Sequence, residues 1–444
     1  MRKQFSRRDF LTLVILLVAL TAAAVKITLR VEPSVFVIEP VVSRVRPLQT
    51  QLGRVLSPDG NFRFDAQFVS AAPGQAVHAA SMVELTNGDL RAVWFSGSRE
   101  GAGDVTLQTA VMDVAKGRWG MESTVIDRTQ LQQGLQRYVK KLGNPVIGRA
   151  ADGSLLLWMV NVSLGGWAGS SISWVRSTDE GSTWSRPQRL VTSPFLNIST
   201  LPKGAPVGMV DGHIALPVYH EFFTKFAEIL RLDADGKVVD KVRIPGSQTS
   251  LQPVVMVSGP NTAQAYMRSG TASAVMTSAT SDGGKSWSAS HPTDWPNPDS
   301  AVAGVATRGG TQWLALNPGH RNREQLALIQ TQLGGSFDGQ TLWRVEASAF
   351  PNTRLLRPQY EHLLGGELIV AGASPPQIQA YIASAMRQLC NDRECAQEYS
   401  YPFLLESSDG AIHVIYTWHR TRIKHIRLDP LQPELVMAPR PPVR

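Results

Sequence analysis

The sequence predicts an all-β fold made of antiparallel hairpins, and two repeated patterns indicate it. An Asn-Gly or Asp-Gly dipeptide between two short β-type runs is typical of a hairpin turn. Examples stand at Asn87-Gly88, Asp152-Gly153, Asp211-Gly212 and Asp409-Gly410. An eight-residue string that ends in tryptophan also recurs along the chain. Hairpins spaced a few tens of residues apart favour the blades of a β-propeller.

Composition narrows the class of protein. The chain has 444 residues, of which 43% are hydrophobic and 18% charged, so it has enough apolar material for a large core. Residues 1–30 carry six basic side chains and one acidic, which is five of the eight net positive charges. Nucleic-acid binding requires a basic face on the folded domain. We therefore expect no nucleic-acid partner.

The N-terminal segment has the pattern of an export leader. The pair Arg7-Arg8 precedes an apolar run from Leu11 to Val25. Paired arginines before a short apolar helix are typical of a twin-arginine signal, and an ordinary signal anchor is the alternative. We expect residues 1–30 to be an export signal or membrane anchor and the protein's only contact with a membrane. The body would then be periplasmic, or held at the inner membrane facing the periplasm.

The rest of the chain divides by composition. Residues 31–63 contain several prolines and are expected to form a tether and an entry segment, and residues 431–444 form a proline-rich tail. Between them, residues 64–430 form the predicted propeller. Its segment 345–398 is longer than the interval between blades requires. That segment is interpreted as an insertion, either a lid, a partner site or a helical element.

Two cysteines exclude a disulfide-rich scaffold and a four-cysteine zinc site. In an oxidising compartment Cys390 and Cys395 can pair as a local disulfide, and two free thiols are the alternative. His413, His419 and His425 are close in sequence, but alternate residues of a strand point to opposite faces. We expect neither a metal nor a cofactor, because the chain also lacks an oxygen-rich calcium loop and a phosphate-binding glycine loop.

The recurring octapeptide has the chemistry of a tight turn. Its third residue is aspartate, which can accept backbone N–H bonds, and its glycine permits positive φ. Its final tryptophan can fold back onto the neighbouring strands. Copies occupy 177–184 and 280–287, with a degraded copy at 336–343. We expect Asp179 and Asp282 to be structural rather than catalytic.

This octapeptide is identified as the Asp-box of sialidases and related propellers. From about residue 65 to 430 the chain resembles the six-bladed sialidase propellers, and more narrowly their bacterial BNR-repeat, sialidase-like branch. The strings that carry the narrower likeness are 78–81, 94–100, 219–221, 416–420 and 423–425. The resemblance implies an all-β, six-bladed β-propeller of the sialidase type, preceded by the hydrophobic leader helix.

The resemblance also implies a site. Sialidases hold the substrate carboxylate with three arginines, because a planar guanidinium matches a carboxylate with two parallel bonds. They use an aspartate as acid/base and a tyrosine, activated by a glutamate, as nucleophile. The likeness assigns the nucleophile to Tyr399, with Tyr401 as a nearby competitor. It assigns the acid/base to Asp104 and places Arg99 in the pocket.

Two members of the arginine triad have counterparts. Arg268 lies at a predicted strand end one hairpin before the second Asp-box, and Arg323 precedes the third. Arg321 is the alternative to Arg323. The resemblance implies that these side chains bind the substrate carboxylate.

The chain departs from the sialidase pattern at two positions. His78 stands where the first arginine belongs, and Gln252 or Ser250 stands where the activating glutamate belongs. Glu221 is a possible substitute from the neighbouring blade. Losing one bidentate carboxylate contact removes about 1.5–3 kcal/mol, and a tyrosine without its base stays mostly protonated near neutral pH. These changes bear on catalysis rather than on the fold.

Three functions fit these residues. The first is an exo-acting glycoside hydrolase of the sialidase type on sialic acid or a related acidic sugar of an extracellular glycan. The second is a polysaccharide lyase on a uronate polymer, with His78, His425 and Tyr399 as acid/base groups and Gln252 near the carboxylate. The third is a non-catalytic propeller that binds a glycan. In each, the expected partner is an acidic oligosaccharide or polysaccharide, and we expect a monomer.

Overall fold

The computed structural model divides the chain into two units, Met1–Pro33 and Ser34–Arg444. It describes residues 7–28, 35–38, 55–56 and 62–430, except positions 194, 272, 349 and 352. The first unit contains one helix, α1 (Arg7–Thr28), which carries the arginine pair and the apolar run. Within the described residues, no helix is both long and apolar enough to cross a membrane. The tail 431–444 and most of the tether 31–63 lie outside the described residues.

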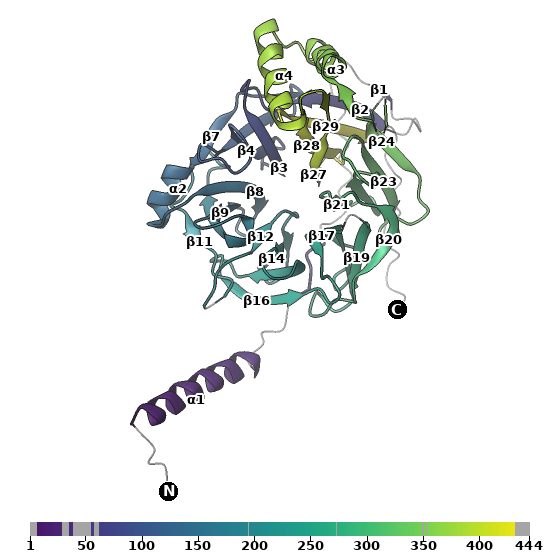
Figure 1. Ribbon diagram of the computed structural model, residues 1–444. Helices are drawn as coiled ribbons and strands as arrows, with labels where there is room; N and C mark the ends of the chain where they lie inside the picture. Colours follow the sequence, from purple (N-terminus) through teal and green to yellow (C-terminus); the bar gives the residue numbers. More distant parts are fainter. Residues whose placement is uncertain are drawn as a thin grey trace, which may run out of the picture. The chain divides into compact units, whose positions relative to one another are not determined.

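The second unit is a six-bladed β-propeller, as predicted, with the blades following one another around a common axis (Figure 1). The first blade contains β3 (Ala76–Glu84), β4 (Leu90–Gly97), β5 (Thr106–Asp113) and β6 (Arg118–Trp119), and β7 (Ser123–Asp127) also pairs with β5. The second contains β8 (Lys141–Arg149), β9 (Leu155–Val162), β10 (Ser170–Ser177) and β11 (Gln188–Arg189). The third contains β12 (Leu201–Pro202), β14 (Ile214–His220), β15 (Phe226–Leu232) and β16 (Val238–Arg243), and β13 (Val207–Gly208) pairs with β14.

The remaining blades repeat the plan. The fourth contains β17 (Ser250–Val257), β18 (Ala263–Ser269), β19 (Ala274–Thr280) and β20 (His291–Pro296). The fifth contains β21 (Ala303–Ala306), β22 (Thr311–Leu316), β23 (Leu326–Gln332) and β24 (Leu342–Glu346). The sixth contains β27 (Tyr399–Glu406), β28 (Ile412–Trp418) and β29 (Arg422–Pro430), completed by β2 (Phe62–Phe68) and β1 (Val55–Leu56). The core lies between neighbouring blades.

The ring closes by joining the two ends of the domain. Strand β2 runs antiparallel to β29, with Phe62 opposite Pro430 and Phe68 opposite Lys424. An early strand therefore completes the last blade, which ties the start of the propeller to its end. The seam strands lie toward the outer edge of this blade, whereas its inner strand β27 contributes residues to the site described below.

The predicted hairpin turns are confirmed. Gly88, Gly153, Gly212 and Gly410 all have φ between 81° and 87°, which is the left-handed conformation that such turns require. In each turn the preceding Asn or Asp accepts a bond from the backbone N–H two residues on, as Asp152 does from Ser154 at 3.0 Å.

The Asp-boxes form the turns between the third and fourth strands of their blades. Asp179 accepts bonds from Ser177 Oγ at 2.7 Å and from the backbone N–H of Thr183 at 2.9 Å. Asp282 makes the same pair of bonds with Thr280 and Ser286. In the degraded copy, Asp338 bonds to Ser336 and to the backbone N–H of Asp294 instead. The two intact boxes therefore hold their own turns together.

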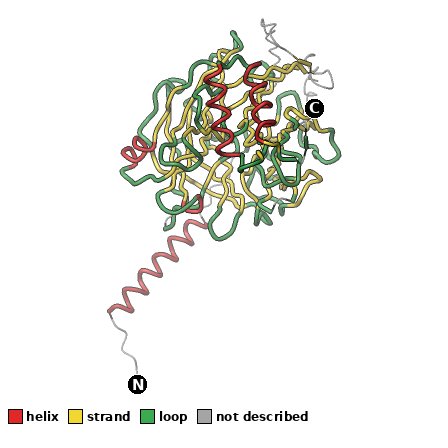
Figure 2. Tube along the Cα trace, turned by 45° about the horizontal axis from the view of Figure 1, so that its top comes forward, coloured by secondary structure: helices red, strands yellow, loops and turns green. Residues whose placement is uncertain are grey.

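The long segment between the fifth and sixth blades is a helical hairpin (Figure 2). Helix α3 (Arg357–Val370) packs beside α4 (Pro375–Leu389), and short strands β25 (Leu355–Leu356) and β26 (Glu394–Cys395) pair at its base. A disulfide joins Cys390 to Cys395, which confirms the predicted pairing. Short helices α2 (Arg128–Leu135) and η1 (Trp167–Gly169) lie in the first and second blades' connections.

Candidate functional site

The first strands of the blades lie nearest the axis, where β3 contacts β8 and β27, and β21 contacts β17 and β27. Each first strand has a backbone distortion in it or just before it. Residues with left-handed φ lie in these strands or just before them: Ala79, Asn144, Ser199, Gln252, Asp299 and Tyr401. In β3, β8, β17 and β27 the pairing register shifts at this point, which marks a bulge. Bulges re-aim side chains and are common beside functional sites. The repeat thus directs a set of polar side chains toward the axis.

Arg268 and Arg323, the two arginines predicted to bind a carboxylate, meet at one residue. At the end of β18, Arg268 donates from Nε to Asp299 Oδ1 at 2.6 Å and from Nη1 to Gln252 Oε1 at 3.1 Å. Arg323, from the loop after β22, donates from Nη2 to the Asp299 backbone carbonyl at 2.8 Å. Arg321, the alternative, is exposed. The structure therefore brings together guanidinium groups that are distant in sequence.

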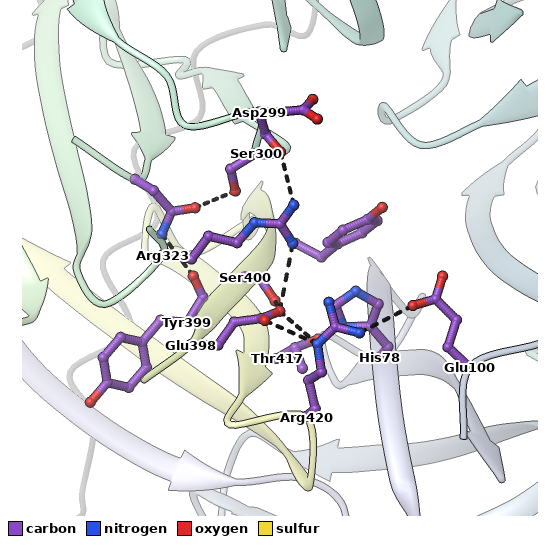
Figure 3. Close-up of polar contacts among 12 residues, drawn as sticks. His78, Glu100, Asp299, Ser300, Arg323, Glu398, Tyr399, Ser400, Thr417 and Arg420 are labelled. Carbon is purple, nitrogen blue, oxygen red and sulfur yellow. Dashed lines mark hydrogen bonds and ion pairs between the residues drawn. The ribbon is translucent and has the colours of Figure 1, made fainter. Parts of the chain in front are cut away.

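A third arginine, which sequence reasoning missed, completes the cluster. Arg420, just after β28, donates from Nε to both oxygens of Glu398 at 3.0 Å and from Nη1 to Glu100 Oε2 at 3.2 Å (Figure 3). Arg323 Nη1 lies 3.6 Å from Glu398 Oε1. Burial alone would raise the pKa of Glu398, but the Arg420 and Arg323 guanidiniums outweigh it and lower that pKa. The carboxylate therefore stays ionised and holds both arginines in place.

His78, which the sequence comparison set in place of the first sialidase arginine, is a buried residue of β3. Its Nδ1 is 2.9 Å from Thr417 Oγ1, and its ring centroid is 4.2 Å from that of Tyr401. Burial, followed by the charges of Arg420, Arg323 and other nearby cations, lowers the pKa of His78 well below its ordinary value. The imidazole is therefore neutral at neutral pH.

The two candidate tyrosines are separated by the fold. Tyr399 is 2% exposed, and its ring packs edge-on against His419, with the centroids 5.0 Å apart. Its ring points away from the Arg323 and Glu398 group (Figure 3), and burial raises its pKa well above 10. Tyr401 instead accepts a bond from Gln252 Nε2 at 3.1 Å. The residue in the axial cluster is thus Tyr401, which the sequence reasoning had placed second.

The other predicted residues are spread around the cluster. Asp104 and Arg99 are exposed on the loop after β4, where Asp104 accepts bonds from Ser98 N and Oγ at 3.1 and 3.0 Å. Glu221 is half-buried after β14, and burial raises its pKa. Among the described residues, His425 forms no hydrogen bond to the cluster. Its ring nitrogens instead lie 2.9 Å from His413 Nδ1 and 3.2 Å from Trp119 Nε1.

The BNR repeat-like domain family matches residues 88–414. The chain belongs to this family. No curated protein shows significant sequence similarity to the chain.

Solved structures of similar fold include two sialidases. The Hadza microbial sialidase superposes with a TM-score of 0.59 at 13% identity, over 80% of this chain and 66% of its own length. The NanB sialidase of Streptococcus pneumoniae gives 0.57 at 10% identity, over 82% and 70%. A protein of unknown function from Dyadobacter fermentans gives 0.62 at 11% identity, over 82% and 98%. At these identities the likeness shows the fold, a sialidase-like BNR propeller.

One further residue of this BNR-repeat propeller lies beside Tyr401. Lys203, after β12, is 3% exposed and donates from Nζ to the backbone carbonyl of Pro402 at 2.8 Å, across the ring of blades. The ammonium lies 5.8 Å from the ring centroid of Tyr401 and 5.7 Å from that of Phe403. Burial lowers its pKa to about 7. A lone buried lysine gave no recognisable pattern in the sequence.

The arrangement is suited to binding an anion and to proton transfer. Guanidinium groups lie beside a phenol and a neutral imidazole, and partly shielded charges act more strongly than in water. Among the described residues, no group of three or more His, Cys, Asp or Glu is placed to hold a metal ion.

Proposed function

We propose that the protein is an exo-acting glycoside hydrolase that removes an acidic sugar, such as a sialic acid, from an extracellular glycan. The observation that carries the proposal is the convergence of Arg268 and Arg323 on Asp299, beside Tyr401. A bidentate contact with a carboxylate is the recognition for which guanidinium is best suited. The sialidases among the structural neighbours support this choice of substrate class.

The proposed reaction assigns one step to each group. The oxygen of Tyr401 attacks the anomeric carbon, the bond to the leaving oxygen breaks, and Asp104 gives that oxygen a proton. Water then attacks the same carbon, releases the sugar from Tyr401 and returns a proton to Asp104. Asp104 must move inward from its exposed loop, and binding of substrate can draw such a loop over the site.

The phenol must lose its proton, and no carboxylate is bonded to it in the described residues. His78, packed on the Tyr401 ring, is neutral and so able to accept a proton. The surrounding cations oppose that protonation. A bound substrate carboxylate would offset part of their charge and raise the pKa of His78 when catalysis requires it.

The test is release of free acidic sugar from a panel of exported glycans, detected by mass spectrometry. Arg268→Gln should lower kcat/KM at least about a hundredfold, because it removes a charge-assisted contact. Arg344→Gln is a matched control, since Arg344 is exposed on β24 in the outer part of the fifth blade. Binding of acidic glycans without any turnover would instead indicate a non-catalytic propeller.

A polysaccharide lyase is the second candidate, and one observation favours it. The neutral His78 lies against Tyr401, and Gln252 rather than a glutamate bonds to that phenol. In a lyase, a neutral base removes the proton beside a uronate carboxylate, while Arg268 and Gln252 neutralise the charge. Digestion of uronate polymers would then produce unsaturated, ultraviolet-absorbing ends, whereas a hydrolase produces none.

We also propose export to the periplasm through the twin-arginine route. The disulfide between Cys390 and Cys395 supports an oxidising compartment. Cell fractionation of the Arg7→Lys/Arg8→Lys double variant tests the route. The variant should accumulate inside the cytoplasm, and unchanged export would contradict the proposal.

A further inference from the structure

Beside the axial cluster, the second blade presents a tryptophan and a lysine that no step above uses. Lys141, the first residue of β8, places its Nζ 5.6 Å from the ring centroid of Trp167, the first residue of η1. Both side chains are half-buried and therefore reachable from solvent. A cation beside an indole combines charge with a flat apolar surface.

Trp167 is coupled by packing to the axial cluster. It packs against a small apolar group that includes Leu201, Tyr219 and Leu251. The phenol of Tyr219 accepts bonds from Gln252 at 3.4 Å and from Asn144 at 3.3 Å. Tyr219 therefore links the two regions, because its ring belongs to the apolar group beside the indole and its hydroxyl bonds to Gln252 of the axial cluster.

The close approach of Trp167 depends on a glycine. A Cβ at Gly143 in β8 would lie only 3.1 Å from Cη2 of Trp167 and 3.8 Å from Cδ1 of Phe95. Phe95 in turn packs edge-on against His78, with the centroids 5.7 Å apart. Trp167 and Phe95 thus both border Gly143, and Phe95 packs against His78.

The lysine also borders the loop that carries Asp104. A Cβ at Gly101 would lie 3.4 Å from Lys141 Nζ, and Gly103 accepts a bond from Arg128 Nε at 2.8 Å. A general acid protonates the oxygen that leads to the next sugar unit. The proposed function places that oxygen near the Asp104 loop, and the ammonium of Lys141 borders the same loop.

The stretch of sequence that contains Lys141 is basic. From residue 128 to 151 the chain contains five basic residues and no carboxylate. Within the described parts of the chain, Lys141 forms no ion pair with a carboxylate. A half-buried indole beside an ammonium that has no carboxylate partner suits a sugar ring that carries its own negative charge.

We propose that Lys141 and Trp167 form a second subsite, which binds the neighbouring sugar unit of the same glycan when that unit also carries a carboxylate or a sulfate. The inference rests on the proposed function, because the first unit is held by Arg268 and Arg323. It deepens that function by making the preferred substrate a polyanionic chain rather than a single acidic end group.

The test measures affinity rather than turnover. Calorimetry would compare a sialic acid trimer and a galacturonic acid trimer with sialyllactose, in which the acidic unit has neutral neighbours. Every protein, the wild-type reference included, carries Tyr401→Phe so that no probe is cleaved. Sulfated sialyllactose distinguishes a sulfate from a carboxylate as the second charge. The variants are Lys141→Gln, Trp167→Ala and the conservative Trp167→Phe. Lys237→Gln is the matched control, since its side chain is 77% exposed on the third blade.

The wild-type protein should bind an all-acidic trimer about tenfold more tightly than sialyllactose, and Lys141→Gln should abolish that difference. Binding of sialyllactose by Lys141→Gln should stay within about twofold of wild type. Trp167→Ala should weaken trimer binding, and Trp167→Phe should restore most of it.

Two failures are distinguishable. If wild type binds the trimers and Lys141→Gln binds them equally well, the second subsite is refuted while the proposed function stands. If wild type binds none of the acidic probes, the proposed function fails and this inference fails with it. A loss of binding to sialyllactose in Lys141→Gln would also count against a separate subsite.

Discussion

The axial cluster and the Asp-box turns both depend on carboxylates, but the partners of those carboxylates differ. Asp282 in an Asp-box bonds to the hydroxyl groups and backbone of its own octapeptide, near solvent. Glu398 in the axial cluster is 7% exposed and bonds to Arg420, with Arg323 nearby. The first carboxylate shapes a local turn, whereas the second holds charges that come from different parts of the ring.

This difference teaches where function can reside in a repeat protein. The Asp-box is complete within eight residues, so it can recur in any blade. The axial cluster exists only when all six blades are in place, because its members lie on the first and last blades as well as between them. Four predictions sharpen that contrast, from the largest expected effect to the smallest.

The largest expected effect is a difference in activity between substitutions of the two tyrosines of β27. Tyr401→Phe should reduce kcat by about a thousandfold or more, since it removes the nucleophile. Tyr399→Phe should retain at least about a third of the activity, because its ring packs in the core. Both variants keep their aromatic volume, so thermal unfolding serves as the control for folding. Comparable activity losses in the two variants would contradict the assignment.

Glu398→Gln should destabilise the protein by about 2–4 kcal/mol, because removing one partner of a buried ion pair leaves guanidinium charge uncompensated. Urea unfolding measures the loss. The matched variant is Glu394→Gln, whose carboxylate lies 3.9 Å from Arg354 with both side chains nearly half exposed; it should change stability by less than about 0.5 kcal/mol. Equal losses of stability in the two variants would mean that the buried ion pairs of Glu398 stabilise the protein no more than an exposed pair does.

Acidification should weaken the sixth blade through its buried histidines. Burial lowers the pKa of His425 to about 3 and that of His413 well below 6.5. An unfolded histidine titrates near 6.5, so the contribution of these neutral rings is complete above that pH and is lost as the pH falls toward 3. Each histidine can lower the free energy of unfolding by up to about 1.4 kcal/mol for each pH unit of acidification in that window.

Unfolding curves between pH 7.5 and 4.5 check this slope. The His413→Gln/His425→Gln double variant should show a shallower dependence on pH. His291→Gln removes an exposed histidine and should leave the slope unchanged. A wild-type slope of zero over this range would refute the prediction.

The smallest effects should come from the Asp-boxes. Asp282→Ala removes several bonds within one turn and should cost about 1–2 kcal/mol of stability, with kcat/KM unchanged. Asp338→Ala, in the degraded copy, should cost less than about 1 kcal/mol because fewer bonds depend on it. Thermal unfolding and activity assays on the same samples separate these outcomes. A large activity loss in Asp282→Ala would show that the boxes are not merely structural.

Much of the fold was predictable from local patterns. The Asp-Gly turns and the Asp-boxes require only neighbouring residues, so their geometry follows from sequence alone. Arg268 and Arg323 were found through their position relative to the Asp-boxes. Arg420, Glu398 and Lys203 were not recognised, because their significance depends on partners that lie in other blades or far along the chain.

By itself, the sequence determined the hairpins and the propeller, since the turns follow from short-range chemistry that is repeated along the chain. The resemblance to sialidases singled out Arg268 and Arg323, and the structure shows that both bond to Asp299. Only the tertiary structure decided which tyrosine faces the axis. Two residues apart on a regular strand, Tyr399 and Tyr401 would share one face. The bulge between Ser400 and Phe403, with φ of 53° at Tyr401, breaks that alternation and sends the two rings to different environments. The bulge lies in the inner strand of a blade, where neighbouring blades pack against it. Those contacts join residues that are far apart in sequence, so a local sequence pattern does not predict them.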